Sequence, residues 1–518
     1  MNKNKLLAVM LAATMVCTTG MMAACGDGNK DDDKKPAGSS GYSMDITEQV
    51  SSWKKTTKNN ATYYSAEGVV YCEKPTTKAK QALNIYVPAE YMNDDGSINS
   101  SGTRNGYTAE TAPILYINSV GAYQGKVPYK ITDATETLAM KQGWYFDYIN
   151  QGFVLAFAGA RGRSDYDSNS VALGKAPVGL SDLKAGIRFL KHNGDKLPGD
   201  TDKIISSGMS AGGAMSMLIA TSGNSSEFDS YLQAMGAVMD ETDDVYAAQA
   251  YCPITDLDYA DFAYEWMFKN DNNNTANGLS AFQKALSANF YNEYISYFNS
   301  KNIKVGEVTY QLGSDGRSGT FYDWLLEQYA ISYRVNAGEN ATLPSYLSSL
   351  DSIVTNHNHR SKVCPTFDSL DISTTASASS ENGVFGNPAA SLKDADFQRH
   401  FCVGVTEQIK ALESQFPTEY AKYYEAYKAQ SDLAEVKKQV ELYNPYTYLY
   451  AGNTDVAQKI RICVGSADSD TSIAVTGQLT LTLRSLGIDT EYAIMWGQGH
   501  TDADLAGAYE AWVNSISK

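Results

Sequence analysis

The chain has 518 residues, of which 43% are hydrophobic and 19% are charged, a composition typical of globular proteins rather than of fibres or disordered chains. Its formal net charge of −17 at pH 7 disfavours nucleic acids and anionic membrane surfaces as partners. At this length the chain can bury one large core with a substantial insertion, or form two domains.

Residues 1–24 have the pattern of a secretory signal peptide, with Lys3 and Lys5 before an apolar run and small residues leading to Cys25. The surroundings of Cys25 resemble the bacterial lipoprotein box, which implies cleavage before Cys25, a lipid anchor on its sulfur and an extracytoplasmic location at the cell surface. An ordinary signal peptide with an incidental Cys25 is the alternative. Residues 25–45 are predicted to form a flexible tether, because little of this stretch is apolar. No other stretch is long and apolar enough to span a bilayer.

From Ala82 onward, apolar strands alternate with helical stretches, which predicts α/β layers. Strands are expected at residues 82–87, 113–117, 153–158, 203–207 and 249–254. A helix is expected at residues 181–192, where apolar residues recur at near-helical spacing before the break at Leu197-Pro198-Gly199-Asp200. Residues 46–254 are therefore predicted to be the first part of an α/β core.

The pentapeptide Gly208-Met209-Ser210-Ala211-Gly212 follows the fourth of these strands and precedes helix-forming residues 213–220. A sharp strand-to-helix turn needs small residues around the serine, so that Oγ is exposed and the helix N-terminus offers amide donors to an oxyanion. A glycine-rich strand end that only packs closely against its helix is the structural alternative. The motif predicts a serine hydrolase with Ser210 as its nucleophile.

The pattern changes at residues 255–443, where aromatic-rich helical stretches occur without regular strand alternation. Helices are expected at residues 262–268, 281–298, 322–334 and 397–428. Strands return at residues 459–465 and 490–496, with an amphipathic helix at 479–486 between them. The sequence therefore predicts a core made of residues 46–254 and 444–518, with a large inserted, mainly helical lid domain at 255–443.

A serine nucleophile needs a base and an acid that orients the base. Of the five histidines, His500 alone lies in the C-terminal core after a strand, in a loop with Gly497 and Gly499, and it is the natural base. A solvent-facing loop histidine is the alternative. Asp468 and Asp470 both follow the preceding core strand, and Asp468 is preferred as the acid. Either aspartate could instead form a turn or cap a helix, and spacing does not separate them.

The oxyanion hole is expected to use the backbone N–H of Ala211 and that of Gly121 or Ala122, in the loop after the strand at 113–117. A plain turn is the alternative interpretation of this loop. Because only backbone donors are required, the side chain at residue 122 does not determine whether this loop can donate to the oxyanion.

The cysteines left after Cys17 and Cys25 are Cys72, Cys252, Cys364, Cys402 and Cys463. Their number is odd, their spacing is wide and no metal-ligand spacing occurs among them. An extracytoplasmic site permits disulfides, but the pattern does not require any, and buried free thiols are expected. No metal or organic cofactor is implied.

Taken together, these segments resemble the bacterial subtype B tannases of the α/β-hydrolase superfamily. The resemblance covers roughly residues 61–516. Its motifs include Ala112-Pro113-Ile114-Leu115, Ala160-Arg161-Gly162-Arg163, Ser210-Ala211-Gly212-Gly213-Ala214, Ala250-Tyr251-Cys252-Pro253-Ile254 and Ala263-Tyr264-Glu265-Trp266. The resemblance implies an α/β-hydrolase fold and the hydrolysis of galloyl esters.

The resemblance also implies roles for individual residues. The triad positions of the family match Ser210, Asp468 and His500. The residues that hold the three galloyl hydroxyls match Lys362, Glu381 and Asp470. Two carboxylates can accept hydrogen bonds from phenolic hydroxyls, while an ammonium group interacts favourably with the phenolic oxygens. Judged without the resemblance, Lys362 and Glu381 would each more often be a solvated surface charge. The chain departs from the family at Ala122, where glycine is frequent, and in a longer loop between Lys362 and Glu381.

The leading expectation is a lipid-anchored tannase, a serine esterase that releases gallate through an acyl-enzyme. A feruloyl or general aromatic carboxylesterase with the same triad is the second hypothesis. The third is a catalytically inactive surface lipoprotein that binds polyphenols or glycans, for which the 36 tyrosines would provide stacking surfaces.

Overall fold

The structure is a computed structural model, and it describes residues 41–133, 137–268, 280–357, 384–385, 405–432, 434–468 and 470–518. Several predicted features lie outside these residues, namely the signal peptide, Cys25, Lys362, Glu381, Cys364 and Cys402. Residues 41–45, the end of the predicted tether, are already held by the folded chain. The N–H of Tyr42 donates to the carbonyl of Glu73 at 2.9 Å, and Asp45 caps the short helix α1 (Ile46–Gln49).

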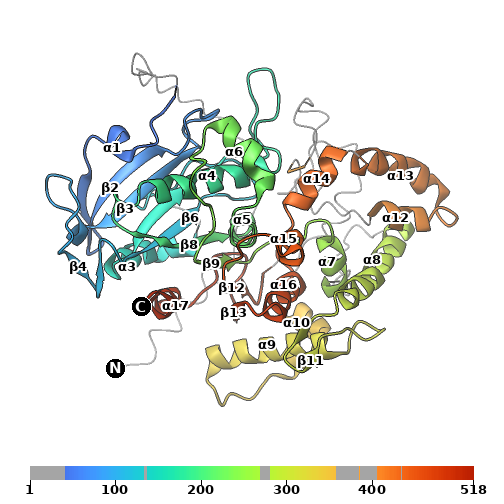
Figure 1. Cartoon of the computed structure of the whole chain (residues 1–518). Helices are drawn as coiled ribbons and strands as arrows, with labels where there is room; N and C mark the ends of the chain where they lie inside the picture. Colours follow the sequence, from blue (N-terminus) through green and yellow to red (C-terminus); the bar gives the residue numbers. More distant parts are fainter. Residues whose placement is uncertain are drawn as a thin grey trace. The chain divides into compact units, whose positions relative to one another are not determined.

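Within the described residues, a mixed sheet of nine strands organises the fold, in the order β1-β2-β3-β7-β6-β8-β9-β12-β13 (Figure 1). The strands β1, β2, β3 and β7 pair antiparallel, whereas all pairs from β7 to β13 are parallel. The bounds are β1 (Lys54–Lys58), β2 (Ala61–Val70), β3 (Ala82–Pro88), β6 (Pro113–Asn118), β7 (Val154–Ala158), β8 (Asp200–Met209), β9 (Ala247–Tyr251), β12 (Lys459–Gly465) and β13 (Asp489–Met495). The carboxyl ends of β8, β9, β12 and β13 therefore lie along one edge.

The central parallel strands β6 and β7 are mostly apolar because helices cover both faces of the sheet. Every residue of β6 and β7 is buried. The helices of this part are α2 (Leu138–Gln142), α3 (Trp144–Asn150), α4 (Val178–His192), α5 (Ala211–Thr221), α6 (Asp229–Met235), α16 (Ile473–Ser485) and α17 (Ala508–Ser517). Among them, α5 contacts β8 and β9, and α16 contacts β12 and β13. The predicted α/β-hydrolase architecture is confirmed, with α4, α5 and α16 near their predicted positions.

The described chain between β9 and β12 is mainly helical. Its helices are α7 (Ala260–Phe268), α8 (Ala281–Ser300), α9 (Thr320–Ala337), α10 (Leu350–His357), α12 (Val405–Ala411), α13 (Pro417–Ser431), α14 (Ala434–Leu442) and α15 (Pro445–Ala451). A small hairpin, β10 (Lys304–Val305) with β11 (Val308–Thr309), joins α8 to α9. The helix expected at 397–428 is interrupted between α12 and α13, because Pro417 begins a new helix rather than continuing one.

The insertion packs onto the carboxyl-terminal half of the sheet. One hydrophobic cluster joins residues of α7, α8 and α9 with Val464 of β12 and Ile494 of β13. Aromatic stacking continues across the boundary, since the rings of Trp324 on α9 and Tyr492 on β13 lie 5.4 Å apart. Burial of large aromatic side chains of this kind dominates the stability of such a contact.

A buried asparagine ties the beginning of the insertion to its end. The Nδ2 of Asn444 donates to Asp256 at 3.0 Å and to Asp258 at 2.7 Å, although these residues are almost two hundred positions apart in the chain. The Oδ1 of Asn444 also accepts from the N–H of Tyr446, which caps α15. Burial raises the pKa of both aspartates, which favours a pair that shares one proton. We refer to Asn444, Asp256 and Asp258 as the clasp.

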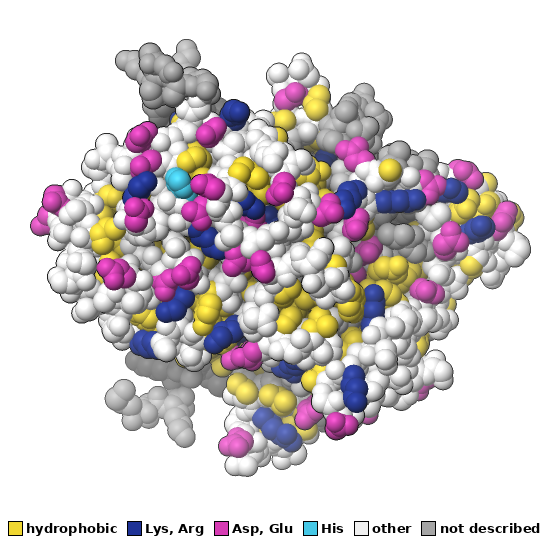
Figure 2. Space-filling model, viewed as in Figure 1, with side chains coloured by type: hydrophobic (Ala, Val, Ile, Leu, Met, Phe, Trp, Pro, Cys, Tyr) yellow, Lys and Arg dark blue, Asp and Glu magenta, His cyan; other side chains and the backbone are white. Residues whose placement is uncertain are grey.

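The surface carries charged side chains of both signs. On the face drawn in Figure 2, acidic and basic side chains of the described residues are interspersed, and basic side chains do not gather into one broad patch. Among the described helices, none combines the length and the apolar character needed to cross a membrane.

Candidate active site

Ser210 lies at a sharp turn between β8 and α5. Its backbone has φ 60° and ψ −123°, a strained conformation for a residue with a side chain. The neighbouring glycines are required because a side chain at these positions would clash with the backbone. A Cβ at Gly208 would lie 2.4 Å from the carbonyl oxygen of Gly212, and a Cβ at Gly213 would lie 2.4 Å from that of Tyr251. The chain folds here as a nucleophile elbow, because only glycine allows strand, turn and helix to approach so closely.

Asn118, at the end of β6, stabilises this turn through hydrogen bonds. Its Nδ2 donates to the carbonyls of Ser207 and Gly212 at 3.1 and 2.9 Å, and to the hydroxyl of Ser216 at 3.1 Å. The side chain is buried, so these bonds fix the distance between β8 and the first turn of α5. Sequence reasoning missed Asn118; the available signal was a polar residue closing an otherwise apolar strand.

The structure brings Ser210, His500 and Asp468 together. The Nε2 of His500 lies 2.7 Å from the Oγ of Ser210, and its Nδ1 lies 3.0 Å from both carboxylate oxygens of Asp468. These side chains come from the loops after β8, β13 and β12, whose carboxyl ends share one edge of the sheet. In this geometry the imidazole can take the proton of Ser210 while the carboxylate holds its tautomer.

The loop after β12 gives its two aspartates different surroundings. Asp468 is buried, and its Oδ1 accepts from the backbone N–H groups of Asp470 and Thr471, each at 2.8 Å. Asp470 is half-buried, and its carbonyl accepts from the hydroxyl of Tyr264 on α7. Asp468 therefore faces His500 as a fixed acceptor, whereas Asp470 lies where the insertion meets the core.

The charge of Asp468 controls the protonation of His500. Burial by itself lowers the pKa of His500, but the facing carboxylate of Asp468 and the neighbouring Cys252 together outweigh burial and hold that pKa well above the ordinary histidine value. A carboxylate at this distance also stabilises the imidazolium that forms when the serine loses its proton.

Two further aspartates hold the loop that carries His500. Asp504 forms a buried bidentate pair with Arg461 of β12, with N–O distances of 2.6 and 2.8 Å. Asp502 accepts from the backbone N–H groups of Leu138 and Ala139 at the start of α2. The sequence did not single out these residues, because an aspartate in a loop after a strand has many ordinary uses.

The predicted oxyanion loop packs against the elbow. A Cβ at Gly212 would lie 2.7 Å from the carbonyl oxygen of Val120, so this loop and the first turn of α5 are in contact. Ala211 is the first residue of α5, and its N–H has no acceptor within the helix. Ala122 has φ 52°, in the left-handed region that favours glycine, and Arg163 donates from Nε to its carbonyl at 2.8 Å. The carbonyl of Gly121 accepts from the N–H of Gln124 at 2.9 Å.

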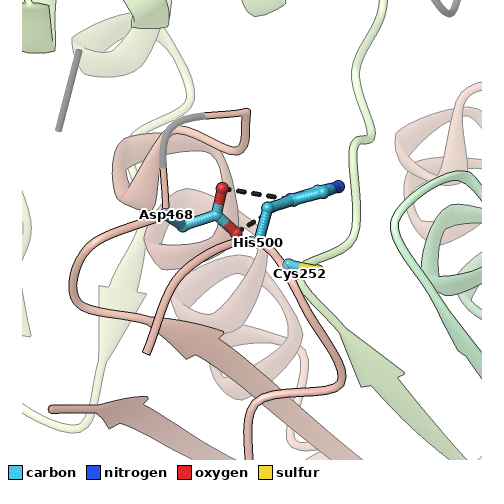
Figure 3. A group of neighbouring side chains, drawn as sticks. All are labelled: Cys252, Asp468 and His500. Carbon is cyan, nitrogen blue, oxygen red and sulfur yellow. Dashed lines mark hydrogen bonds and ion pairs between the residues drawn. The ribbon is translucent and has the colours of Figure 1, made fainter. Parts of the chain in front are cut away.

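A thiol lies beside the histidine and the acid. Cys252 follows β9, and its Sγ donates to the carbonyl of Thr501 at 3.2 Å. Single ligand atoms of Cys252, Asp468 and His500 all lie within 4.8 Å of one another (Figure 3). Burial raises the pKa of the Cys252 thiol. The other described cysteines, Cys72 and Cys463, are also buried and free, so disulfides are absent among these three.

Comparison with known proteins shows which enzymes this chain is similar to. The family model described as BD-FAE matches residues 133–296. Tannin acyl hydrolase from Lactobacillus plantarum is similar over 90% of this chain and 97% of its own, with 28% identity and a TM-score of 0.73. A tannin acyl hydrolase in complex with ethyl gallate is similar over 90% of this chain and 97% of its own, with 28% identity and a TM-score of 0.72. Tannase from Fusobacterium nucleatum is similar over 90% of this chain and 98% of its own, with 28% identity and a TM-score of 0.70. The comparison with curated proteins found no match.

Proposed function

Because this chain is a carboxylic ester hydrolase with an α/β-hydrolase fold and is similar to tannases over 90% of its length, we propose that it is a tannase that hydrolyses galloyl esters to gallate through an acyl-enzyme. The observation that carries the proposal is the arrangement of Ser210, His500 and Asp468 in a chain similar along 90% of its length to an enzyme with bound ethyl gallate.

In the proposed mechanism, Ser210 is the nucleophile. His500 takes its proton as the Oγ attacks the ester carbonyl, and the N–H of Ala211 stabilises the oxyanion together with an amide of Gly121 or Ala122. The imidazolium then gives the proton to the leaving alcohol, and the galloyl group remains on Ser210. Water, activated by the same imidazole, attacks the acyl-enzyme and releases gallate.

The insertion at residues 255–443 is proposed to set the substrate preference. We assign the recognition of the galloyl hydroxyls to Asp470, Lys362 and Glu381, of which Asp470 lies among the described residues. Its carbonyl bond to Tyr264 of α7 supports this assignment, because it joins the insertion to the loop of the catalytic acid. Buried polar groups that must pair with ring hydroxyls discriminate strongly against rings that lack them.

The test is paired hydrolysis of methyl gallate and methyl ferulate by a soluble form that lacks residues 1–25. We expect a strong preference for gallate, and Ser210→Ala should reduce the rate by roughly a thousandfold or more. Asp470→Asn should lower kcat/KM for gallate much more than for methyl benzoate, because it changes a contact to a ring hydroxyl. Equal losses on both esters would refute the role of Asp470 while leaving the esterase assignment intact.

A feruloyl or general aromatic carboxylesterase is the second candidate, and the BD-FAE match over residues 133–296 favours it specifically. A preference for methyl ferulate in the same assay would select it. If neither ester were cleaved while gallate still bound, the third hypothesis, a polyphenol- or glycan-binding surface protein, would replace both.

We also propose that residues 1–24 are removed as a signal peptide and that Cys25 carries a lipid at the cell surface. The support is the sequence pattern around Cys25. Metabolic labelling with a palmitate analogue in a bacterial host tests it. Label in the native chain that is lost in Cys25→Ser is expected, whereas equal labelling of both would refute the anchor.

A further inference from the structure

Cys252 has no part in the proposed hydrolysis, yet it lies beside two residues that do. It follows β9 with φ 38°, and its N–H donates to the carbonyl of Cys463 at 2.6 Å, so its backbone is held by the neighbouring strand β12. Its thiol is buried and bonds to the carbonyl of Thr501, the residue after His500. The thiol is therefore fixed next to the loop of the proposed base.

The three side chains form a ligand set that suits zinc. A thiolate, an imidazole and a carboxylate are all common ligands of Zn²⁺, whereas Ca²⁺ and Mg²⁺ prefer oxygen alone. Tetrahedral Zn²⁺ with bonds of about 2.0–2.3 Å separates its ligand atoms by roughly 3.4–3.6 Å. One ligand atom from each of Cys252, Asp468 and His500 lies within 4.8 Å of the others, so movements of about 1 Å complete the site. Figure 3 shows the carboxylate of Asp468 facing His500, with Cys252 beside them on a separate segment of the chain.

We propose that Cys252, Asp468 and His500 form an inhibitory binding site for a thiophilic divalent cation of the zinc class. Coordination requires the thiol proton, and any proton on the imidazole nitrogen that binds, to leave to solvent. The imidazole lone pair and the carboxylate then bind the cation. The bonds between Asp468 and His500 at 3.0 Å are replaced, and the base that Ser210 needs is lost. The cation therefore stops hydrolysis by binding the side chains of the triad rather than by competing with the ester.

The cation site is built from residues of the triad and Cys252, so cation binding does not depend on which ester is preferred. Binding is therefore measured first without any substrate, by adding Co²⁺ to the soluble protein and recording the thiolate-to-cobalt charge-transfer absorption. We expect this absorption in the native protein and in Cys72→Ala, which removes a different buried free thiol. It should disappear in Cys252→Ala and in Cys252→Ser, and the serine variant serves if the alanine variant does not fold.

Zn²⁺ is then titrated against hydrolysis of whichever ester the enzyme cleaves, and each variant is compared with its own metal-free rate. We expect reversible inhibition that a chelator relieves and that Mg²⁺ does not reproduce. Loss of the thiolate should raise the half-inhibiting Zn²⁺ concentration by at least about tenfold. Removing a residue that only supports a metal ligand already weakens metal binding by about tenfold or more, and Cys252 would be a direct ligand. Unchanged inhibition in Cys252→Ser, or no charge-transfer absorption in the native protein, would overturn the proposal. A failure of the gallate assay leaves the cobalt measurement unaffected.

Discussion

The substitution Asp468→Asn tests the proposed catalytic geometry most directly. In the native protein, Oδ1 of Asp468 is held by the N–H groups of Asp470 and Thr471, each at 2.8 Å. An asparagine oxygen can keep these bonds, and its NH₂ group then faces the Nδ1 of His500. Two donors cannot face each other, so the imidazole must carry its proton on Nε2 instead.

The magnitude follows from this change of tautomer. With the proton on Nε2, an N–H rather than a lone pair points at the Oγ of Ser210, 2.7 Å away, and the serine has no base. The equivalent change in the Ser-His-Asp template costs about 10⁴ in kcat, which corresponds to about 5.5 kcal/mol of transition-state stabilisation. We therefore expect a loss of about 10⁴ in kcat with little change in KM, because Asp468 is buried away from the substrate.

The assay is steady-state hydrolysis of methyl gallate at neutral pH, with circular dichroism and thermal unfolding to establish that the variant is folded. Ser210→Ala sets the background rate. A folded Asp468→Asn enzyme that retained more than about a tenth of the native kcat would refute the reasoning, because another group would then orient the base.

Three further predictions concern pH and stability. Since only neutral His500 is a base, kcat/KM should rise with pH through its raised pKa, with a midpoint above 6.5, and Asp468→Asn should move this midpoint to lower pH. Asp504→Ala leaves the buried guanidinium of Arg461 without its bidentate carboxylate partner and should cost about 3–5 kcal/mol in urea unfolding, and the apolar double variant Arg461→Met with Asp504→Leu should recover most of it. A double variant no more stable than Asp504→Ala would contradict this explanation. Gly213→Ala places a Cβ 2.4 Å from a carbonyl of β9 and should cost roughly 3 kcal/mol or more, so native-like melting would argue against a tightly packed elbow.

Much of the core could be predicted from sequence because its strands are buried on both faces. β6 and β7 appear in the sequence as short apolar runs bounded by breaks, and their bounds lie within a residue or two of the expected ones. β1 could not be recognised in this way. Its sequence Lys-Lys-Thr-Thr-Lys is exposed along almost its whole length, and only its antiparallel pairing with β2 defines it as a strand.

The site was predictable where chemistry restricts the residue type. A nucleophile elbow needs glycines around Ser210, and few histidines were available to serve as the base. The proximity of Cys252 could not be predicted, because it arises from the neighbouring positions of β9 and β12, which are far apart in sequence. Asn118 was missed for the same reason, since its bonds cross about ninety residues of chain. Lys362 and Glu381 remain predictions, because they lie outside the described residues.

The clasp has a consequence for how a chain with this fold can diversify. Asn444 holds the two ends of the insertion at one point, and the intervening chain starts at the sheet edge that carries Ser210. The entropic cost of closing a loop grows only slowly with its length, by about 0.6 kcal/mol for each doubling. Evolution can therefore lengthen or shorten the chain between these ends at little entropic cost, as long as the aromatic contact between α9 and β13 is kept. The proposed substrate-recognition residues of the insertion can change in this way while Ser210, His500 and Asp468 are kept.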